Sequence, residues 1–217
     1  MSTATVYSED VTYSAWRTSN LSLSSVLSVT ISDTTITTST ILVGLIYSSP
    51  NYVALQHPIK FDLTSIPSGS VISSATFTVK TSSASSGAFA GSAQLELVPF
   101  DWGVSVEIAD YLSQTEYSAI AAVATYPLTG SIAADQTLSF TSGTPLINNL
   151  LPGSTSKFML CNKAFRDGTA PTTQTDQSVK IYASNYVTSS YRPTLSITYT
   201  SGSSGPATNA VFFGSCF

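Results

Sequence analysis

Residues 57–79 read HPIKFDLTSIPSGSVISSATFTV, and this stretch decides the fold. Apolar and polar residues alternate on both sides of the turn sequence Pro67-Ser68-Gly69. Alternation with a period of two places one face of a strand in a core and the other in water. Phe61 and Phe77 belong to the inward-facing sets of the two strands. The stretch therefore predicts two strands, joined by a turn, that face one common core.

The same alternation recurs along most of the chain. It appears in residues 26–32, 35–37, 94–98, 137–140, 178–182 and 194–199. Clusters of Gly, Pro, Ser, Asn and Asp separate these segments, as is typical of turns. Many short strands with regular turns indicate one all-β domain, a jelly-roll β-sandwich over residues 1–200. We expect the last strand, 194–199, to pair with an early strand, because the two ends of a domain often lie close together.

One segment, residues 106–125, departs from this pattern. Ser113 and Glu116 have the spacing of a capping box, in which each side chain bonds a free backbone amide of the other residue. Apolar residues beginning at Tyr117 follow at helical spacing. The sequence therefore predicts one short helix at about residues 114–122.

The composition is poor in charge. Of 217 residues, 8 are Lys or Arg and 12 are Asp or Glu, so 9% are charged and the net charge is −4. Soluble domains carry about 25% charged residues. The chain instead has 39 serine and 30 threonine residues, whose hydroxyls keep the surface wet. The absence of a Lys/Arg cluster argues against nucleic-acid binding, which needs a basic surface.

Targeting signals are not visible in the sequence. The N-terminus MSTATVYSEDVTYSAW has neither the basic nor the apolar region of a signal peptide. The longest apolar run, residues 41–47, is too short to cross a bilayer, so no membrane partner is expected. A hydroxyl-rich surface without a secretion signal fits proteins released by cell lysis, such as virion components.

The C-terminal segment differs in kind from the rest. Residues 201–209 are rich in Gly and Ser and are predicted to be a flexible linker. Residues 210–217, AVFFGSCF, follow as an apolar C-terminal arm. Fold-back onto the parent domain is one alternative, but a fold-back segment would not need so flexible a spacer. We expect the arm to dock on neighbouring virion subunits or in a homo-oligomer, through Val211, Phe212, Phe213 and Phe217.

The search for chemistry returns no assembled site. His57 is the only histidine, and no nucleophile motif surrounds any serine, so no enzyme activity is expected. Four acidic residues cluster near Trp102 in the sequence: Asp101, Glu107, Asp110 and Glu116. A pair of them could act as the two carboxylates of a glycosidase, but local caps and turns are the more common role of such residues. Neither a metal motif nor a phosphate loop is present, so no cofactor is predicted, although a structural Ca²⁺ stays possible.

Two further residue types were weighed. The two cysteines, Cys161 and Cys216, are too few for a disulfide framework and are predicted to be free, with Cys161 buried. Aromatic rings can stack on sugars, and the candidates for such a surface are Tyr52, Trp102 and Tyr126. Core packing is the alternative role for Trp102.

Short motifs in the sequence resemble the DNRLRE-type (disaggregatase-related) modules. The resemblance rests on residues 57–79, the closing strand at 192–199, Asp101-Trp102 and residues 109–111. The resemblance covers the chain from about Val6 to Tyr199. It implies a jelly-roll sandwich, often a carbohydrate-binding or wall-associated module.

Taken with the composition, these patterns favour a non-enzymatic structural protein of a bacteriophage virion, as a head decoration or cement protein or a tail or collar component. The alternative is a carbohydrate-binding module or adhesin subunit, extracellular or at the cell surface, that binds a glycan. An enzyme, a lyase or glycosidase acting through Asp101 and Asp110, is the third possibility.

Overall fold

A computed structural model describes most of the first 202 residues. The described ranges are 1–9, 15–17, 21–29, 34–36, 38–85, 89, 93–170 and 177–202. The predicted linker beyond residue 202 and the predicted arm at 210–217 lie outside them, as does Cys216. The docking residues proposed from the sequence lie outside them as well: Val211, Phe212, Phe213 and Phe217.

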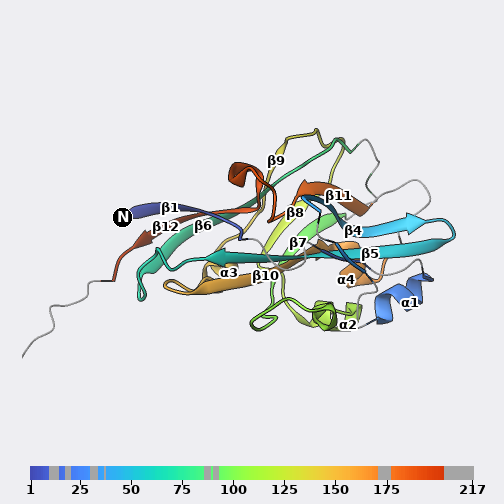
Figure 1. The fold of residues 1–217 in the computed structure, drawn as a ribbon, viewed down its shortest axis with the longest axis horizontal. Helices are drawn as coiled ribbons and strands as arrows, with labels where there is room; N and C mark the ends of the chain where they lie inside the picture. The colour runs from blue at the N-terminus through green and yellow to red at the C-terminus, as the bar shows by residue number, and fades with distance from the viewer. Residues whose placement is uncertain are drawn as a thin grey trace, which may run out of the picture.

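The described chain is mostly strand (Figure 1). The strands are β1 (Ser2–Tyr7), β2 (Ala15–Arg17), β3 (Thr34–Ile36), β4 (Thr40–Ser48), β5 (Asn51–Asp62), β6 (Val71–Lys80), β7 (Gln94–Pro99), β8 (Ala124–Pro127), β9 (Thr137–Ser139), β10 (Thr155–Asn162), β11 (Gln177–Tyr182) and β12 (Thr194–Thr200). The helices are α1 (Leu23–Ser28), α2 (Gln114–Ala119), α3 (Thr144–Ile147) and α4 (Lys163–Asp167), with 3₁₀ turns η1 (Ile108–Asp110) and η2 (Ser189–Tyr191).

The strands form two antiparallel sheets in the order of a jelly roll. One sheet has the order β1-β12-β6-β9, and the other contains the path β11-β4-β5-β10-β7-β8. Taking β1, β5–β10 and β12 as the eight jelly-roll strands, the first sheet holds strands one, eight, three and six. The second holds two, seven, four and five, so successive strands lie in different sheets except for strands four and five, which pair with each other. Strands β4 and β11 extend the second sheet, and β2 and β3 join it through β5. The predicted all-β jelly-roll sandwich is confirmed.

The terminal strand closes the first sheet. Residues Thr194–Tyr199 pair with residues 2–7 of β1 on one side and with β6 on the other. The expected pairing of the last strand with an early one is therefore confirmed. Figure 1 shows the N-terminus and the end of β12 at the same end of the molecule, while the tip of the β4–β5 hairpin lies at the opposite end.

The first hydrophobic core fills the space between the two sheets. Phe61, Phe77 and Phe158 are fully buried in it. Phe77 lies edge-on to Phe140 with ring centroids 4.7 Å apart, and edge-on to Phe61 at 6.2 Å. The inward positions predicted from residues 57–79 therefore meet in one core.

A second core covers part of the eight-stranded sheet. Side chains from β4, β5, β7 and β10 pack there against α1, α2 and α4, with Phe165 and Tyr117 fully buried. The prediction of a single helix is wrong, because this layer contains α1 and α4 as well as α2. Its one predicted member, α2, has the expected capping box, since Ser113 Oγ accepts from the Glu116 amide and Glu116 Oε2 accepts from the Ser113 amide. The helix ends at Ala119 rather than at residue 122.

The strand predicted at residues 26–32 is wrong at its start, because α1 occupies Leu23–Ser28. Ser22 caps the helix by accepting from the Ser25 amide at 3.3 Å. Leu23, Val26 and Leu27 have helical spacing and pack on the second core. Burial of this helix face stabilises the helix more than the alternating pattern would stabilise a strand. Over so few residues, the sequence pattern of a strand cannot be distinguished from that of a helix face.

Gln56 holds the loop before α2 onto the sheet. Its side chain is fully buried, its Nε2 donates to the Leu112 carbonyl at 2.7 Å, and its Oε1 accepts from the Leu112 amide at 3.1 Å. The amide side chain thus satisfies two buried backbone groups, as a neighbouring strand would.

Gln56→Leu is expected to lower the free energy of unfolding by about 2 kcal/mol, because it leaves both backbone groups of Leu112 without a partner. Urea denaturation measures this loss. Gln94→Leu, at a half-buried position on β7, is the matched control and should change stability by no more than about 0.5 kcal/mol. A Gln56→Leu variant as stable as this control would contradict the assigned role.

Candidate functional site

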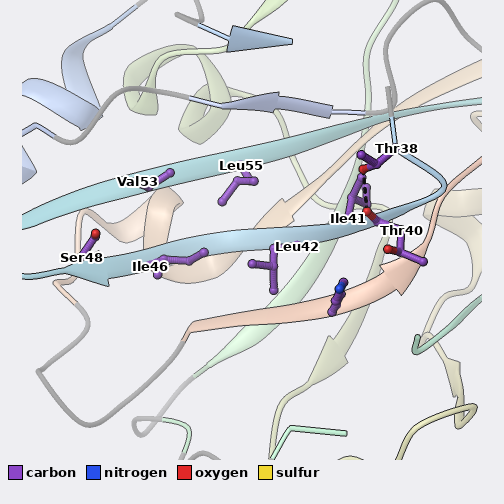
Figure 2. Close-up of a pocket in the computed structure, with 9 residues that line it drawn as sticks. Thr38, Thr40, Ile41, Leu42, Ile46, Ser48, Val53 and Leu55 are labelled. Carbon is purple, nitrogen blue, oxygen red and sulfur yellow. Dashed lines mark hydrogen bonds between the residues drawn. The ribbon is translucent and has the colours of Figure 1, made fainter. Parts of the chain in front are cut away.

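An apolar groove opens where β4, β5 and β11 lie side by side, toward the tip of the hairpin (Figure 2). Its volume is about 330 Å³. Apolar side chains form most of the lining and polar ones the remainder: Ile41, Leu42, Ile46, Val53, Leu55, Thr38, Thr40, Ser48 and Lys180. We call this the hairpin groove.

The strand register explains why the groove exists. Gly44 stands directly opposite Leu55 of β5, between Leu42 and Ile46 along β4. Since Gly44 has no side chain, it adds none to this part of the sheet. Its φ of +132° is also one that other residues rarely adopt. Val53 and Leu55 are 3% and 4% exposed, so they form the floor, while Leu42 at the mouth is 37% exposed.

A second groove has mostly polar lining residues and lies where β7 ends and β10 begins. Its volume is about 490 Å³, and its lining is Pro99, Phe100, Asp101, Asn148, Asn149, Leu151, Ser154, Thr155 and Lys157. We call this the loop groove. It brings one aromatic ring, one acid, two amides and one amine to a single surface, although the loop after α3 contributes its residues from about 50 positions away in the chain.

Lys157 organises the acid of the loop groove. Its Nζ donates to Asp101 Oδ1 at 2.6 Å and also to the Gly103 carbonyl. The bond from Lys157, followed by that from the Gly103 amide, lowers the pKa of Asp101. The carboxylate is therefore charged at neutral pH and accepts hydrogen bonds.

The three predicted sugar-stacking residues do not share one surface. Trp102 is only 6% exposed, with Phe100 and the Lys157 ammonium beside its ring, so it offers no open face and has the packing role instead. Tyr52 borders the second core and is edge-on to Tyr47 at 5.2 Å. Tyr126 borders the first core beside Phe140. Sugar stacking by Tyr52 or Tyr126 stays a prediction.

The four clustered acids make the cap and turn contacts that were predicted as the alternative to a glycosidase pair. Asp101 accepts from the Gly103 amide at 2.9 Å. Glu107 and Asp110 form a capping box around η1, and Glu116 forms the box of α2. These contacts hold the loop that carries Trp102.

His57 is fully buried on β5, with Ser184 Oγ 3.4 Å from Nε2. Ser184 is 1% exposed, so a substrate has no access to this pair. The described part of the chain contains no group of three or more His, Cys, Asp or Glu residues placed to hold a metal ion. None of its helices is long and apolar enough to span a membrane.

Sequence analysis missed a tyrosine cluster at the surface. Tyr182 lies 4.4 Å from Tyr186 and 4.8 Å from Tyr191, measured between ring centroids. Lys80 Nζ lies 3.5 Å from the Tyr191 ring, and the Tyr182 hydroxyl donates to Asp135 at 2.8 Å. That bond raises the pKa of Tyr182 to about 12. The rings pack on one another, and their spacing of four and five residues in a strand-and-loop segment gave no periodic signal.

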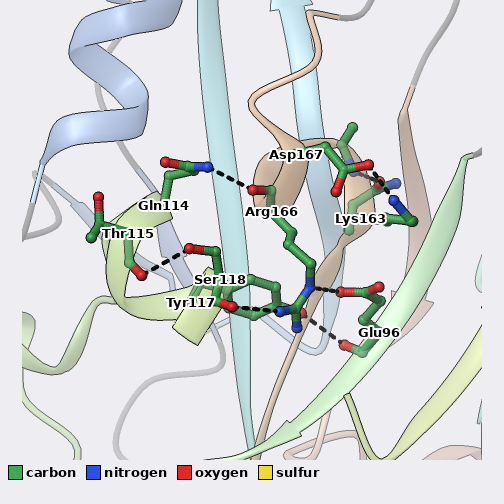
Figure 3. Close-up of polar contacts among 10 residues, drawn as sticks. Glu96, Gln114, Thr115, Tyr117, Ser118, Lys163, Arg166 and Asp167 are labelled. Carbon is green, nitrogen blue, oxygen red and sulfur yellow. Dashed lines mark hydrogen bonds and ion pairs between the residues drawn. The ribbon is translucent and has the colours of Figure 1, made fainter. Parts of the chain in front are cut away.

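Sequence analysis also missed a buried ion pair beneath α2 and α4 (Figure 3). Arg166 Nε donates to Glu96 Oε2 at 2.5 Å, and their side chains are 16% and 6% exposed. The guanidinium lies 4.7 Å from the centre of the Tyr117 ring, whose hydroxyl donates to the Glu96 carbonyl. This network joins two helices to β7, and it is closed to ligands by burial.

Cys161 is buried beside this network, in agreement with the sequence-based prediction, and it is free. Burial raises the pKa of its thiol to about 12. Because this pKa exceeds that of an unfolded thiol, the folded state is favoured below the unfolded pKa, and the advantage disappears as the pH rises toward 12.

In a Cys216→Ser chain we expect no thiol to react with Ellman's reagent at pH 8 while the protein is folded, and one per chain to react in denaturant, since the thiolate is the reactive form. Rapid labelling of the folded protein would contradict the placement of Cys161.

Comparison with family models and with curated proteins finds no match to this sequence.

Proposed function

We propose that the protein is a non-enzymatic structural subunit of a bacteriophage virion, a head decoration or cement protein or a tail or collar component. It joins other copies or other virion subunits through residues 210–217. The observation that carries the proposal is the position of Gly202. This residue follows β12, which ends at one end of the molecule (Figure 1), and an apolar segment follows within about ten residues.

Two features support a role in assembly. Jelly rolls are common in capsid proteins. The chain carries few charged residues, and the structure shows ion pairs among those it describes. Subunits that pack closely against one another therefore meet little like-charge repulsion. The burial of His57 and the cap and turn contacts of the four acids fit a non-enzymatic role.

A truncated chain tests the proposal. The cut belongs after Gly202, because Thr200 still pairs with Val71 and Gly202 touches the backbone of Gly69. We expect the full chain to self-associate at concentrations up to about 100 μM and the truncated chain to be monomeric in analytical ultracentrifugation. Both should melt cooperatively. A truncated chain that assembles like the full chain, or a full chain that stays monomeric, would contradict the proposal.

A second candidate function is glycan binding at the loop groove, with the protein as a carbohydrate-binding module or adhesin subunit. It is favoured by the groove's composition, since Phe100 offers a ring face and Asp101, Asn148 and Asn149 offer fixed polar groups. The resemblance to DNRLRE-type modules supports the same reading. Glycan-array screening followed by Phe100→Ala is the test: binding that the substitution abolishes would establish it, and binding that survives would place any glycan elsewhere.

A further inference from the structure

We infer that the hairpin groove is the acceptor for the C-terminal arm, residues 210–217, of a second copy of this chain. The inference rests on the proposed function, in which the arm joins subunits, and it names the surface that the arm enters. The contact is heterologous: the arm leaves one end of a copy and enters the other end of the next.

The lining of the groove fits an aromatic and aliphatic segment. Leu42 and Ile46 present apolar surface at the mouth, above a floor of Val53 and Leu55. Phe212 and Phe213 are the large apolar side chains of the arm, and a groove of about 330 Å³ has room for aromatic rings. Each ring buried there leaves water, which is the main driving force of such contacts.

The hydroxyl groups at the rim add specificity. Thr40, Ser48 and the ammonium of Lys180 surround the apolar floor. An extended peptide keeps its backbone amides and carbonyls free to bond such groups. The arm contains neither Asp nor Glu nor Lys nor Arg, so no charged side chain is buried when it enters.

Distance favours a second copy over fold-back. Val53 and Asp62 lie nine residues apart on β5, which is about 30 Å of strand. Gly202 touches Gly69, in the loop beyond the Asp62 end of that strand. Ten residues connect Gly202 to Phe212, and they span at most about 36 Å when fully extended. An arm returning to its own groove would need nearly this whole length in a straight line, while its path must pass around the sandwich.

The positions of donor and acceptor also predict the form of the assembly. Because β12, the last strand before the linker, ends at one end of the molecule and the groove lies toward the other, each copy can give one arm and accept one arm (Figures 1 and 2). Such head-to-tail contacts generate a ring where the rotation closes and a filament where it does not.

Point variants of the full chain test the inference. Phe212→Ser/Phe213→Ser removes the donor, and Leu42→Glu places a charge at the mouth of the acceptor, at a position exposed enough to tolerate it. Val187→Glu, 86% exposed, is the matched control for an added charge. In analytical ultracentrifugation we expect both the donor and the acceptor variant to weaken self-association at least about tenfold, and the control to associate like the unmodified chain.

Mixing the two defective variants is the decisive step. The Leu42→Glu chain keeps an intact arm, and the Phe212→Ser/Phe213→Ser chain keeps an intact groove, so a mixture should form heterodimers and nothing larger. If the arm variant is monomeric while Leu42→Glu associates normally, or if mixing restores nothing, the hairpin groove is not the acceptor, although the arm can still join subunits. If the arm variant associates normally, the proposed function itself fails.

Discussion

Arg166→Met is expected to lower the free energy of unfolding by about 3–5 kcal/mol, since it leaves the carboxylate of Glu96 buried without its partner. The Glu96 side chain is 6% exposed, and Arg166 Nε lies 2.5 Å from its Oε2. Methionine keeps most of the apolar stem that packs beside Tyr117, so the loss reports on charge more than on volume. Urea denaturation followed by circular dichroism measures it.

A matched control lies on the same helix. Lys163 pairs with Asp167 four residues on, and their side chains are 31% and 34% exposed. Exposed pairs of this spacing contribute about 0.3–0.5 kcal/mol. Lys163→Met should therefore change stability by a few tenths of a kcal/mol. A similar loss for both variants would show that the Glu96 site is not shielded from water.

The double variant Glu96→Gln/Arg166→Met separates the pair from its surroundings. Replacing both partners removes the uncompensated charge, so the double variant should be more stable than Arg166→Met alone. If the two are equally unstable, the packing of α4 rather than the ion pair sets the loss. Either result fixes how α2 and α4 are held to β7.

The sequence predicts the strands well because their faces alternate between core and water. Residues 94–98, 178–182 and 194–199 all lie in strands that have one inward face. The Ser113–Glu116 capping box is equally local, since both partners lie within one turn, and α2 begins at the predicted residue.

The helical layer could not be predicted from the same pattern. Helix α1 covers the sheet with Leu23, Val26 and Leu27, whereas in the sequence Leu27, Val29 and Ile31 alternate with hydroxyl residues as in a strand. A local signal existed for α4, whose N-terminus is capped by Asn162 and whose C-terminus is followed by Gly168 with φ +63°. The sequence alone favours a turn for this segment, because Asp167-Gly168 is typical of one.

The binding surfaces depend on contacts between distant segments. Leu42 and Lys180 are 138 positions apart and stand opposite each other only because β4 pairs with β11. Asp101 was found from the sequence, but Lys157 and Asn149, which complete the loop groove, lie on other elements. The strand register and the crossover connections determine which distant residues become neighbours, and the local alternation of apolar and polar residues predicts neither of them.

The second large effect is expected in the first core. Phe77→Ala should lower the free energy of unfolding by about 3–5 kcal/mol, because it removes a fully buried ring and leaves a cavity that the two sheets cannot close. The ring contacts Phe61 and Phe140 edge-on, and each such contact adds roughly 0.5–1.5 kcal/mol beyond simple burial.

A graded series tests this role. Phe77→Leu keeps most of the volume and should cost less than half as much as Phe77→Ala, whereas Val187→Ala, at an 86% exposed position, should stay within about 0.5 kcal/mol of the unmodified protein. Thermal unfolding should follow the same order, at about 2–4 °C of melting temperature for each kcal/mol. Since β6, which carries Phe77, joins β12 to β9, weakening its core contact should lower one cooperative transition. A second transition that stays at the original temperature would show that the helical layer and its core unfold separately from the sandwich.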